Sequence, residues 1–236
     1  MIQINIASLN SELKQGLILL CEDYDFALSD TEGLQLFAEH TGENLVQVSL
    51  KGQSAVIRYH QKIHFFRGFS LLLEHLKESS ADYAAAETPQ FDELGAMFDV
   101  SQGNAVLRVS SVKAMLRRMA MMGMNMLMLY CEDSYTVKDE PYFGYMRGRY
   151  TEAELKECDD YAYLLGIEMI PCIQTLSHLI DVLKWPAFDN IKEDYETLFV
   201  GGDETYAFIE HLIRAAVKPF RTKRIHIGMD EAWHLG

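Results

Sequence analysis

The segment Asn125-Met-Leu-Met-Leu-Tyr-Cys-Glu-Asp133 decides the fold class of this chain. From Met126 to Cys131 it is apolar or aromatic without a break, and it ends on two adjacent carboxylates. A short, continuous apolar run is typical of a strand that is covered on both faces, as the strands of a parallel sheet are. Polar groups at the carboxyl end of such a strand mark the edge where α/β proteins place their sites.

Three further segments repeat this pattern of an apolar run followed by polar residues. The predicted strands are LGAMFDV (94–100), NMLMLYC (125–131), IEMIPCI (167–173) and RIHIGM (224–229). Between them, helical spacing and capping signals predict helices over Val109–Met122, Thr151–Leu165 and Asp203–Val217. Strands and helices that alternate in this way predict an α/β protein built of parallel βα units.

The residues after these strands distinguish a (β/α)8 barrel from an open doubly wound sheet. A barrel builds its site from the loops after all its strands, whereas an open sheet concentrates the site at one switch point. In this chain polar residues follow every strand, which favours the barrel: Asp99, Ser101 and Gln102; Glu132 and Asp133; Gln174 and His178; Asp230 and Glu231.

Length limits how much of a barrel the chain can form. A full barrel typically needs about 250 residues, and residues 93–236 have room only for the first four βα units. We therefore expect a barrel that is incomplete in this chain. Either the chain is part of a longer protein, or its half-barrel pairs with another copy in a homo-oligomer that covers the exposed sheet edges.

The first third of the chain has a different texture. A helix-like piece over Thr31–His40 is followed by the β-rich runs ENLVQVSL, SAVIRYH and KIHFF, and then by the amphipathic helical segment FRGFSLLLEHLKES. These elements predict a small α/β domain over residues 1–80. Small residues and a proline in SSADYAAAETPQ weaken both strand and helix signals, so residues 81–92 are expected to be a linker.

Charge and hydropathy exclude several classes of partner. Acidic residues outnumber basic ones by 35 to 21, for a formal net charge of -14. Such a field repels nucleic acid and anionic membrane surfaces, so neither is expected to bind. An export signal and an apolar run of about 20 residues are both missing, which predicts a cytoplasmic protein.

The carboxylate pair Asp230-Glu231 is the strongest candidate for chemistry. An apolar strand that ends on adjacent carboxylates is costly unless the charges are used. Two carboxyl groups held close together push one of their pKa values upward, which can keep one of them protonated as a proton donor. An ordinary solvated loop remains the alternative on spacing alone. A metal site from Asp230, Glu231 and His234 lacks a second histidine cluster, so no metal or other cofactor is expected.

HIGMDEA (His226 to Ala232) resembles the active-site signature of family 20 glycoside hydrolases, the β-N-acetylhexosaminidases. LMLYCEDSY, PYFGYMRGRYTEAEL and IPCIQTLSHL are similar to the bacterial cytoplasmic N-acetylglucosaminidase branch of that family. The resemblance runs from about Leu94 to Gly236. It implies that residues 93–236 are the first half of a TIM-barrel catalytic domain and that the domain before it is non-catalytic.

The resemblance implies a substrate-assisted, retaining mechanism. Glu231 is implied as the general acid and base, and Asp230 as the group that holds the 2-acetamido substituent of the sugar. His178 corresponds to the family's histidine beside the acid, and either Asp133 or Glu132 to the carboxylate that orients it. The implied substrate is a glycan that ends in N-acetylglucosamine or N-acetylgalactosamine.

One departure concerns the first strand. Where the family places an arginine that clamps sugar hydroxyls, this chain has Gln102, close to Asp99, and a glutamine supplies neither charge nor a forked donor. Arg147 and Arg149 are candidates to compensate, and Trp233 is a candidate to stack on the sugar. A second hypothesis is a catalytically silent half-barrel that acts as a sugar-binding or assembly module.

Overall fold

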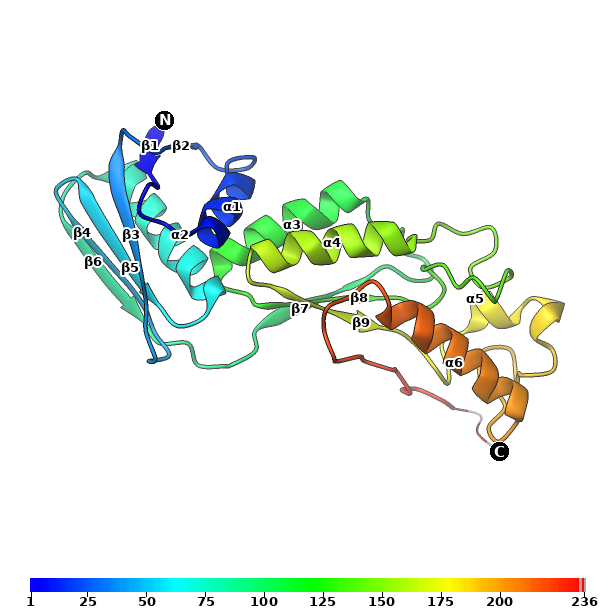
Figure 1. The fold of residues 1–236 in the computed structure, drawn as a ribbon. Coiled ribbons are helices and arrows are strands. Elements are labelled where there is room, and N and C mark those ends of the chain that lie inside the picture. The colour runs from blue at the N-terminus through cyan, green and yellow to red at the C-terminus, as the bar shows by residue number, and fades with distance from the viewer. Residues whose placement is uncertain (234, 236) are drawn as a thin grey trace. The chain divides into compact units, whose positions relative to one another are not determined.

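The computed structural model describes residues 1–233 and 235, and over these residues the chain divides into two compact units. The first unit comprises Met1–Gly95, Ser110–Met126 and Tyr161–Ile167, and the second comprises Ala96–Val109, Leu127–Asp160 and Glu168–Gly236. Figure 1 shows the elements along the chain. No helix within the described residues is both long enough and apolar enough to cross a membrane.

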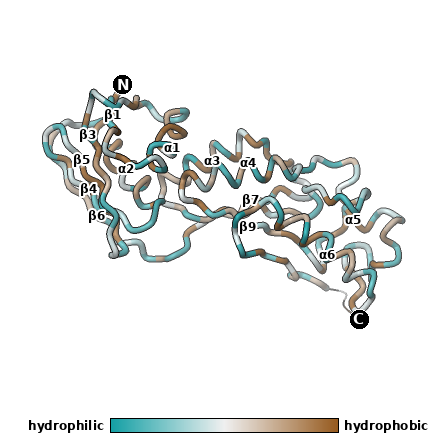
Figure 2. Tube along the Cα trace, in the orientation of Figure 1, coloured by the Kyte–Doolittle hydropathy of each residue, from teal (hydrophilic) through white to brown (hydrophobic). Residues whose placement is uncertain are grey.

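The first unit contains a mixed sheet with the order β2-β1-β3-β5-β4-β6. Strands β1, β2, β3 and β5 pair in parallel, and β4 pairs antiparallel with both β5 and β6. Helix α2 lies against β4 and β5. In Figure 2 brown, hydrophobic stretches alternate with teal, hydrophilic ones along these elements. The elements of this sheet and its helices are β1 (Ile2–Asn5), α1 (Ser11–Leu20), β2 (Phe26–Ser29), β3 (Leu34–His40), β4 (Val46–Lys51), β5 (Ser54–Tyr59), α2 (Lys62–Glu78) and β6 (Tyr83–Glu87).

Helix α2 begins earlier than the sequence predicts. KIHFF, expected to be a strand, forms its first turns, and the backbone N–H of Gln61 donates to Nδ1 of His64 at the helix start. Ile63, Phe66 and Phe69 recur at helical spacing and are buried. A short apolar run is compatible with the period of a strand and with that of a helix. The helix forms here because it buries this whole apolar face.

Two other expectations for the first unit are wrong. The segment expected as helix-like, Thr31–His40, contains strand β3, in which Leu34 and Leu36 are buried while Gln35 and Phe37 are exposed. This alternation has the period of a strand. The expected linker contains strand β6, which pairs with β4 along its backbone. Main-chain hydrogen bonds to a neighbouring strand thus outweigh the weak strand propensity of its alanines.

A buried arginine joins two segments of the first unit. Arg117, 6% exposed, donates from Nε and Nη2 to the two carboxylate oxygens of Asp23, both at 2.9 Å. Its Nη1 donates to Glu22 at 2.7 Å and to the hydroxyl of Tyr161 at 2.8 Å. The Arg117 guanidinium holds the pKa of Asp23 below its usual value. The forked geometry gives this pair both charge compensation and a fixed orientation.

Replacing Arg117 with methionine is expected to lower the free energy of unfolding by about 3 kcal/mol, because removing one member of a buried ion pair leaves its partner uncompensated. Urea unfolding measures the change. Arg118→Met, at an exposed position on the same helix, is the matched control and should cost less than about 1 kcal/mol. Equal losses in the two variants would show that the Arg117 network does not stabilise the fold.

The second sheet has the order β7-β8-β9 and is parallel. Strands β7 (Gly95–Asp99), β8 (Met126–Tyr130) and β9 (Glu168–Cys172) lie within the predicted segments. Helices α3 (Val109–Met122) and α4 (Glu152–Leu164) connect them, and α6 (Asp203–Val217) follows the short α5 (Ile180–Leu183) and the 3-10 helix η1 (Pro186–Phe188). This region therefore has the α/β organisation that the alternating pattern predicts.

The fourth predicted strand, RIHIGM, is an extended segment with one bridge rather than a full strand. His226 forms a parallel bridge to Cys172, and Ile173 N donates to the His226 carbonyl at 2.9 Å. Thr175 N donates in turn to the carbonyl of Gly228 at 3.0 Å. The segment thus runs beside β9, and Ile227 and Met229 remain 41% and 56% exposed.

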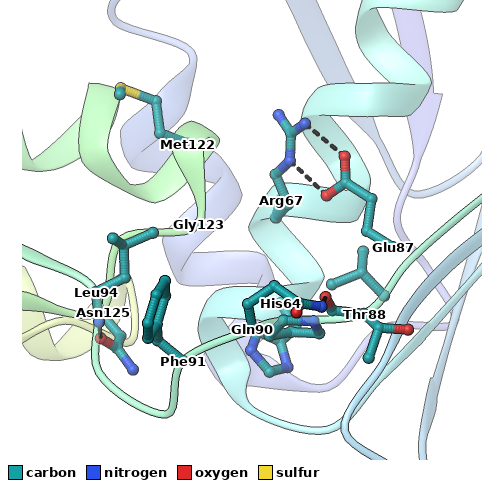
Figure 3. A pocket seen from close by; sticks show the side chains of 12 residues that line it. His64, Arg67, Glu87, Thr88, Gln90, Phe91, Leu94, Met122, Gly123 and Asn125 are labelled. Carbon is teal, nitrogen blue, oxygen red and sulfur yellow. Dashed lines mark hydrogen bonds and ion pairs between the residues drawn. The ribbon is translucent and has the colours of Figure 1, made fainter.

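A cavity of about 370 Å³ lies in the first unit (Figure 3). On one wall, Arg67 donates from Nε and Nη2 to the two carboxylate oxygens of Glu87, at 2.9 and 2.7 Å. Phe91 and Leu94 line another part of the cavity. Arg67 and Glu87 satisfy each other, and His64, which also lines the cavity, accepts a hydrogen bond from the backbone N–H of Gln61 through its Nδ1.

Candidate active site

The loops after β7, β8 and β9, together with the segment after His226, gather polar side chains in the second unit. His178 lies beside two of them: its Nε2 is 3.4 Å from Oε2 of Glu231 and 3.6 Å from Oδ2 of Asp230. Nε2 is buried and makes no hydrogen bond of good geometry. Both carboxylates are more than half exposed. An imidazole edge beside two carboxylates, one side open to solvent, is an arrangement suited to proton transfer.

Asp230 is held by a neighbouring amide. Nε2 of Gln174 donates to Oδ1 of Asp230 at 3.0 Å and to the hydroxyl oxygen of Tyr130 at 2.8 Å. The hydrogen bond from Gln174 is the largest cause that lowers the pKa of Asp230 below its usual value. Asp230 is therefore ionised at neutral pH, with one oxygen fixed and the other facing His178.

Gly228 makes this local geometry possible. Its φ is +51°, and a Cβ at this position would lie 2.4 Å from the carbonyl oxygen of Ile173 and 2.5 Å from Oε1 of Gln174. Only a residue without a side chain allows the backbone before Asp230 to approach β9 so closely. The glycine of HIGMDEA thus brings the carboxylate within reach of the Gln174 amide.

Glu132 continues the same chain of hydrogen bonds. Its Oε1 accepts from the Tyr130 hydroxyl at 3.2 Å and from Nε2 of Gln102 at 3.0 Å. The residue is 2% exposed, and its Oε2 has no hydrogen-bond partner. Burial raises the pKa of Glu132 to about 7 from its ordinary 4.5. Near neutral pH this carboxyl group is thus divided between its acid and ionised forms.

The raised pKa of Glu132 predicts a specific dependence of stability on pH. Below about pH 4 the group is protonated in both the folded and the unfolded chain. As pH rises, the unfolded chain loses this proton first, so the free energy of unfolding falls until the folded group also ionises near pH 7. Between about pH 4 and about pH 8 the natural chain should lose about 3 kcal/mol more than Glu132→Gln does.

Urea unfolding across that pH range measures the difference between the two chains. Glu43→Gln, at an exposed position, is the control and should follow the natural chain at every pH. Parallel curves for the natural chain and Glu132→Gln would contradict the raised pKa.

Asp133 is fully buried and pairs with an arginine rather than with His178. Nε of Arg147 lies 2.9 Å from its Oδ1 and 2.8 Å from its Oδ2. Burial raises the pKa of Asp133, and Arg147 opposes that shift. Arg147 also donates from Nη2 to the carbonyl oxygen of Gln102 at 2.9 Å.

The charge of Asp99, another sequence candidate, is one of the causes that raise the pKa of Glu132. Asp99 accepts hydrogen bonds from Ser101 N and Oγ and from Nδ2 of Asn104, and so shapes its own loop. Burial raises the pKa of Asp99, but these hydrogen bonds outweigh it and leave the value lowered. Trp233 is 74% exposed.

Three contributors were missed or undervalued at the sequence level. Tyr130 ends strand β8, and its signal is the strand's alternation, which places it with Met126 and Met128 on the face opposite Leu127 and Leu129. Asp181 carried no signal beyond its place three residues after His178. For Arg147 the sequence suggests only a substitute for the missing arginine.

Over residues 1–233 and 235, no cluster of three or more histidine, cysteine, aspartate or glutamate side chains is placed to hold a metal ion. His234, considered with Asp230 and Glu231 as a ligand, lies outside the described residues.

Comparison with curated proteins finds relatives that match about half of this chain. The chain is 32% identical over 124 residues to hexosaminidase D of Homo sapiens and 30% identical over 124 residues to that of Bos taurus. These alignments cover 49% of this chain but only 24% and 34% of the relatives.

Solved structures show a similar fold. A mutant β-hexosaminidase of Streptomyces plicatus in complex with its product N-acetylglucosamine has a TM-score of 0.80 at 21% identity, over 98% of this chain and 55% of that one. A family 20 exo β-N-acetylglucosaminidase from Vibrio harveyi in complex with N-acetylglucosamine gives 0.76 at 18% identity, over 98% and 43%. Residues 94–235, more than half of the chain, match the family model described as glycosyl hydrolase family 20, catalytic domain. The chain therefore belongs to glycosyl hydrolase family 20.

Proposed function

We propose that this chain carries the catalytic acid of an exo-acting, retaining β-N-acetylhexosaminidase that releases terminal N-acetylglucosamine or N-acetylgalactosamine in the cytoplasm. The observation that carries the proposal is the position of His178 Nε2, 3.4 Å from Glu231 and 3.6 Å from Asp230. Two carboxylates and an imidazole on one open edge supply the proton transfer and the charge stabilisation that glycoside hydrolysis needs.

In this proposal Glu231 protonates the glycosidic oxygen as the bond to the leaving group breaks. The carbonyl oxygen of the substrate's acetamido group attacks the anomeric carbon and forms a cyclic intermediate, so no enzyme carboxylate acts as nucleophile. Glu231 then takes a proton from water, which opens the intermediate. His178 keeps Glu231 in position through both steps.

Asp230 has an electrostatic part in the same reaction. The acetamido nitrogen gains positive charge as its carbonyl oxygen attacks, and an ionised carboxylate beside it stabilises that charge. The hydrogen bond from Gln174 both keeps Asp230 ionised and orients it. Gln102, Glu132, Asp99 and Trp233 are the proposed contacts to the rest of the sugar, and Asp133 is proposed to support the site from beneath.

The proposal includes an architecture. Residues 93–236 would form the first four βα units of a (β/α)8 barrel, after a non-catalytic domain that comprises residues 1–80 together with strand β6 (Tyr83–Glu87). The exposed Met97 on β7 and Ile227 beside β9 agree with further strands, or a second copy of the chain, covering these edges. The chain spans about half the length of the Streptomyces plicatus enzyme that it matches.

Hydrolysis of p-nitrophenyl N-acetyl-β-D-glucosaminide tests the proposed activity. We expect release of nitrophenol by the purified chain, with the β-anomer of N-acetylglucosamine as the first product seen by NMR. The corresponding galactosaminide shows whether the enzyme accepts both epimers. A folded chain that binds N-acetylglucosamine without turnover would favour the silent sugar-binding module, and no binding at all would exclude both.

A further inference from the structure

We propose that Arg147 is a positioning residue that locks the loops after β7, β8 and β9 into one rigid surface around the proposed catalytic group. This inference rests on the proposed function. It adds a residue that holds the loops of the site in position and does not contact the sugar. The lock consists of one guanidinium group and one acceptor from each of the three loops.

The contacts of Arg147 reach the segments after all three strands. In the loop after β8, Nε of Arg147 donates to Oδ1 of Asp133 at 2.9 Å and lies 2.8 Å from its Oδ2. From the segment after β9, Asp181 in helix α5 places Oδ2 3.2 Å from Nη1. From the loop after β7, the Gln102 carbonyl oxygen accepts from Nη2 at 2.9 Å. Each nitrogen of the guanidinium thus holds a different loop, a task that requires its planar fork of donors.

Each held loop also carries a residue of the candidate site. The side chain of Gln102 donates to Glu132, and Asp181 lies three residues after His178. A shift of the Asp181 loop would therefore move His178 away from Glu231. Misplacement of a catalytic group by about 1 Å can cost about 100-fold in rate.

Charge and burial make the lock strong. Asp133 is completely buried, while Arg147 keeps 23% of its side chain exposed. A buried carboxylate needs a charged, hydrogen-bonded partner, because otherwise no interaction offsets the free energy of hydration that it loses on burial. Burial raises the pKa of Asp133 and Arg147 opposes this, so without the arginine the carboxyl group takes up a proton at higher pH.

The backbone conformation of the preceding residues places Arg147 beside Asp133. Gly144 has a φ of +64°, and a Cβ there would lie 2.3 Å from the carbonyl oxygen of Asp133. Met146 also adopts a left-handed conformation, with a φ of +62°. The loop therefore folds back against Asp133 immediately before Arg147, and Arg149 fixes the turn by donating to the Phe143 carbonyl at 2.6 Å.

These contacts favour a positioning role for Arg147 over the compensating sugar contact for which the sequence makes Arg147 and Arg149 candidates. Its donors already bind Asp133, Asp181 and Gln102. An arginine that bound sugar hydroxyls would raise KM when removed. Loss of a lock instead lowers kcat, because the reacting groups are misplaced in the bound complex.

The test compares Arg147→Gln and Arg147→Lys with the natural chain. Arg108→Gln, at an exposed position in the loop after β7, is the matched control. Circular dichroism first confirms that each variant folds. We expect Arg147→Gln to lower kcat by at least about tenfold with little change in KM. Arg147→Lys should recover part of the loss, because lysine restores the charge but not the fork.

Two readouts separate positioning from a general structural effect. In Arg147→Gln the pH-rate profile should gain an inflection on its acidic side, since Asp133 then titrates at higher pH. Amide hydrogen exchange should accelerate in residues 101–104 and 178–184 of Arg147→Gln and remain unchanged in Arg108→Gln. Hydrogen exchange does not depend on turnover. If the natural chain proves inactive and Arg147→Gln still exchanges faster, the result supports the lock and contradicts only the proposed function.

Two results would overturn the inference. Unchanged exchange in both segments of Arg147→Gln would show that the guanidinium does not hold the loops. Faster exchange with natural kcat would show that the loops need not be held for catalysis.

Discussion

Replacing Glu231 with glutamine is expected to lower kcat for p-nitrophenyl N-acetyl-β-D-glucosaminide by about 10³-fold. Glutamine has nearly the same shape and can still lie beside His178 Nε2, which is 3.4 Å away in the natural chain. It cannot release a proton to the glycosidic oxygen or take one back from water. The loss should thus appear in kcat, with KM changed little.

The leaving group provides a second measure of the same role. A nitrophenolate leaves with less help from an acid than a sugar hydroxyl does, so the variant should lose more activity on chitobiose than on the nitrophenyl substrate. Glu193→Gln, at an exposed position in the second unit, should retain natural rates on both. A loss below about tenfold on both substrates would exclude Glu231 as the general acid.

Replacing Asp230 with asparagine is expected to lower kcat by about 10² to 10³-fold, the usual effect of removing one preorganised electrostatic group. The oxygen of asparagine can still accept the hydrogen bond from Gln174, so the local geometry should persist. What disappears is the negative charge that would stabilise the acetamido nitrogen. Substrate affinity should change less than the rate.

The pH-rate profile tests whether that charge is what matters. The lowered pKa of Asp230 predicts that the natural enzyme keeps this group ionised down to acidic pH. Protonation of Asp230 should lower the rate of the natural enzyme, and this decrease should begin only at low pH. The asparagine variant has no carboxyl group at this position, so its profile should lack that decrease. A variant with a natural rate at every pH would contradict the proposed electrostatic role.

The parallel half of the fold could be predicted from sequence because it repeats a strong local signal. Helices Val109–Met122 and Asp203–Val217 have the predicted bounds, since a wide apolar stripe and clear stops define them. Thr151 and Glu154 form the predicted capping box, with hydrogen bonds in both directions. The mixed sheet was harder to predict, because its strands depend on partners that are distant in sequence, as β6 depends on β4.

The candidate site divides in the same way. That His178 and Glu231 lie at the same edge could be predicted from the apolar segments that precede them, whereas their pairing was implied by the family resemblance. The hydrogen bond between Gln174 and Tyr130 joins two neighbouring strands and could have been found from their alternation. The position of Arg147 could not, because it depends on a long loop turning back at Gly144.

Three residues of the site, Gln102, His178 and Glu231, have left-handed backbones with φ of +28°, +59° and +52°. A side chain in this conformation costs about 1 kcal/mol relative to glycine. Glycine at these places would make a more heat-resistant molecule and would leave the working surface without its functional groups. Resistance to heat and catalytic power therefore oppose each other at these three positions, and a stabilised version of this protein is best sought elsewhere in the chain.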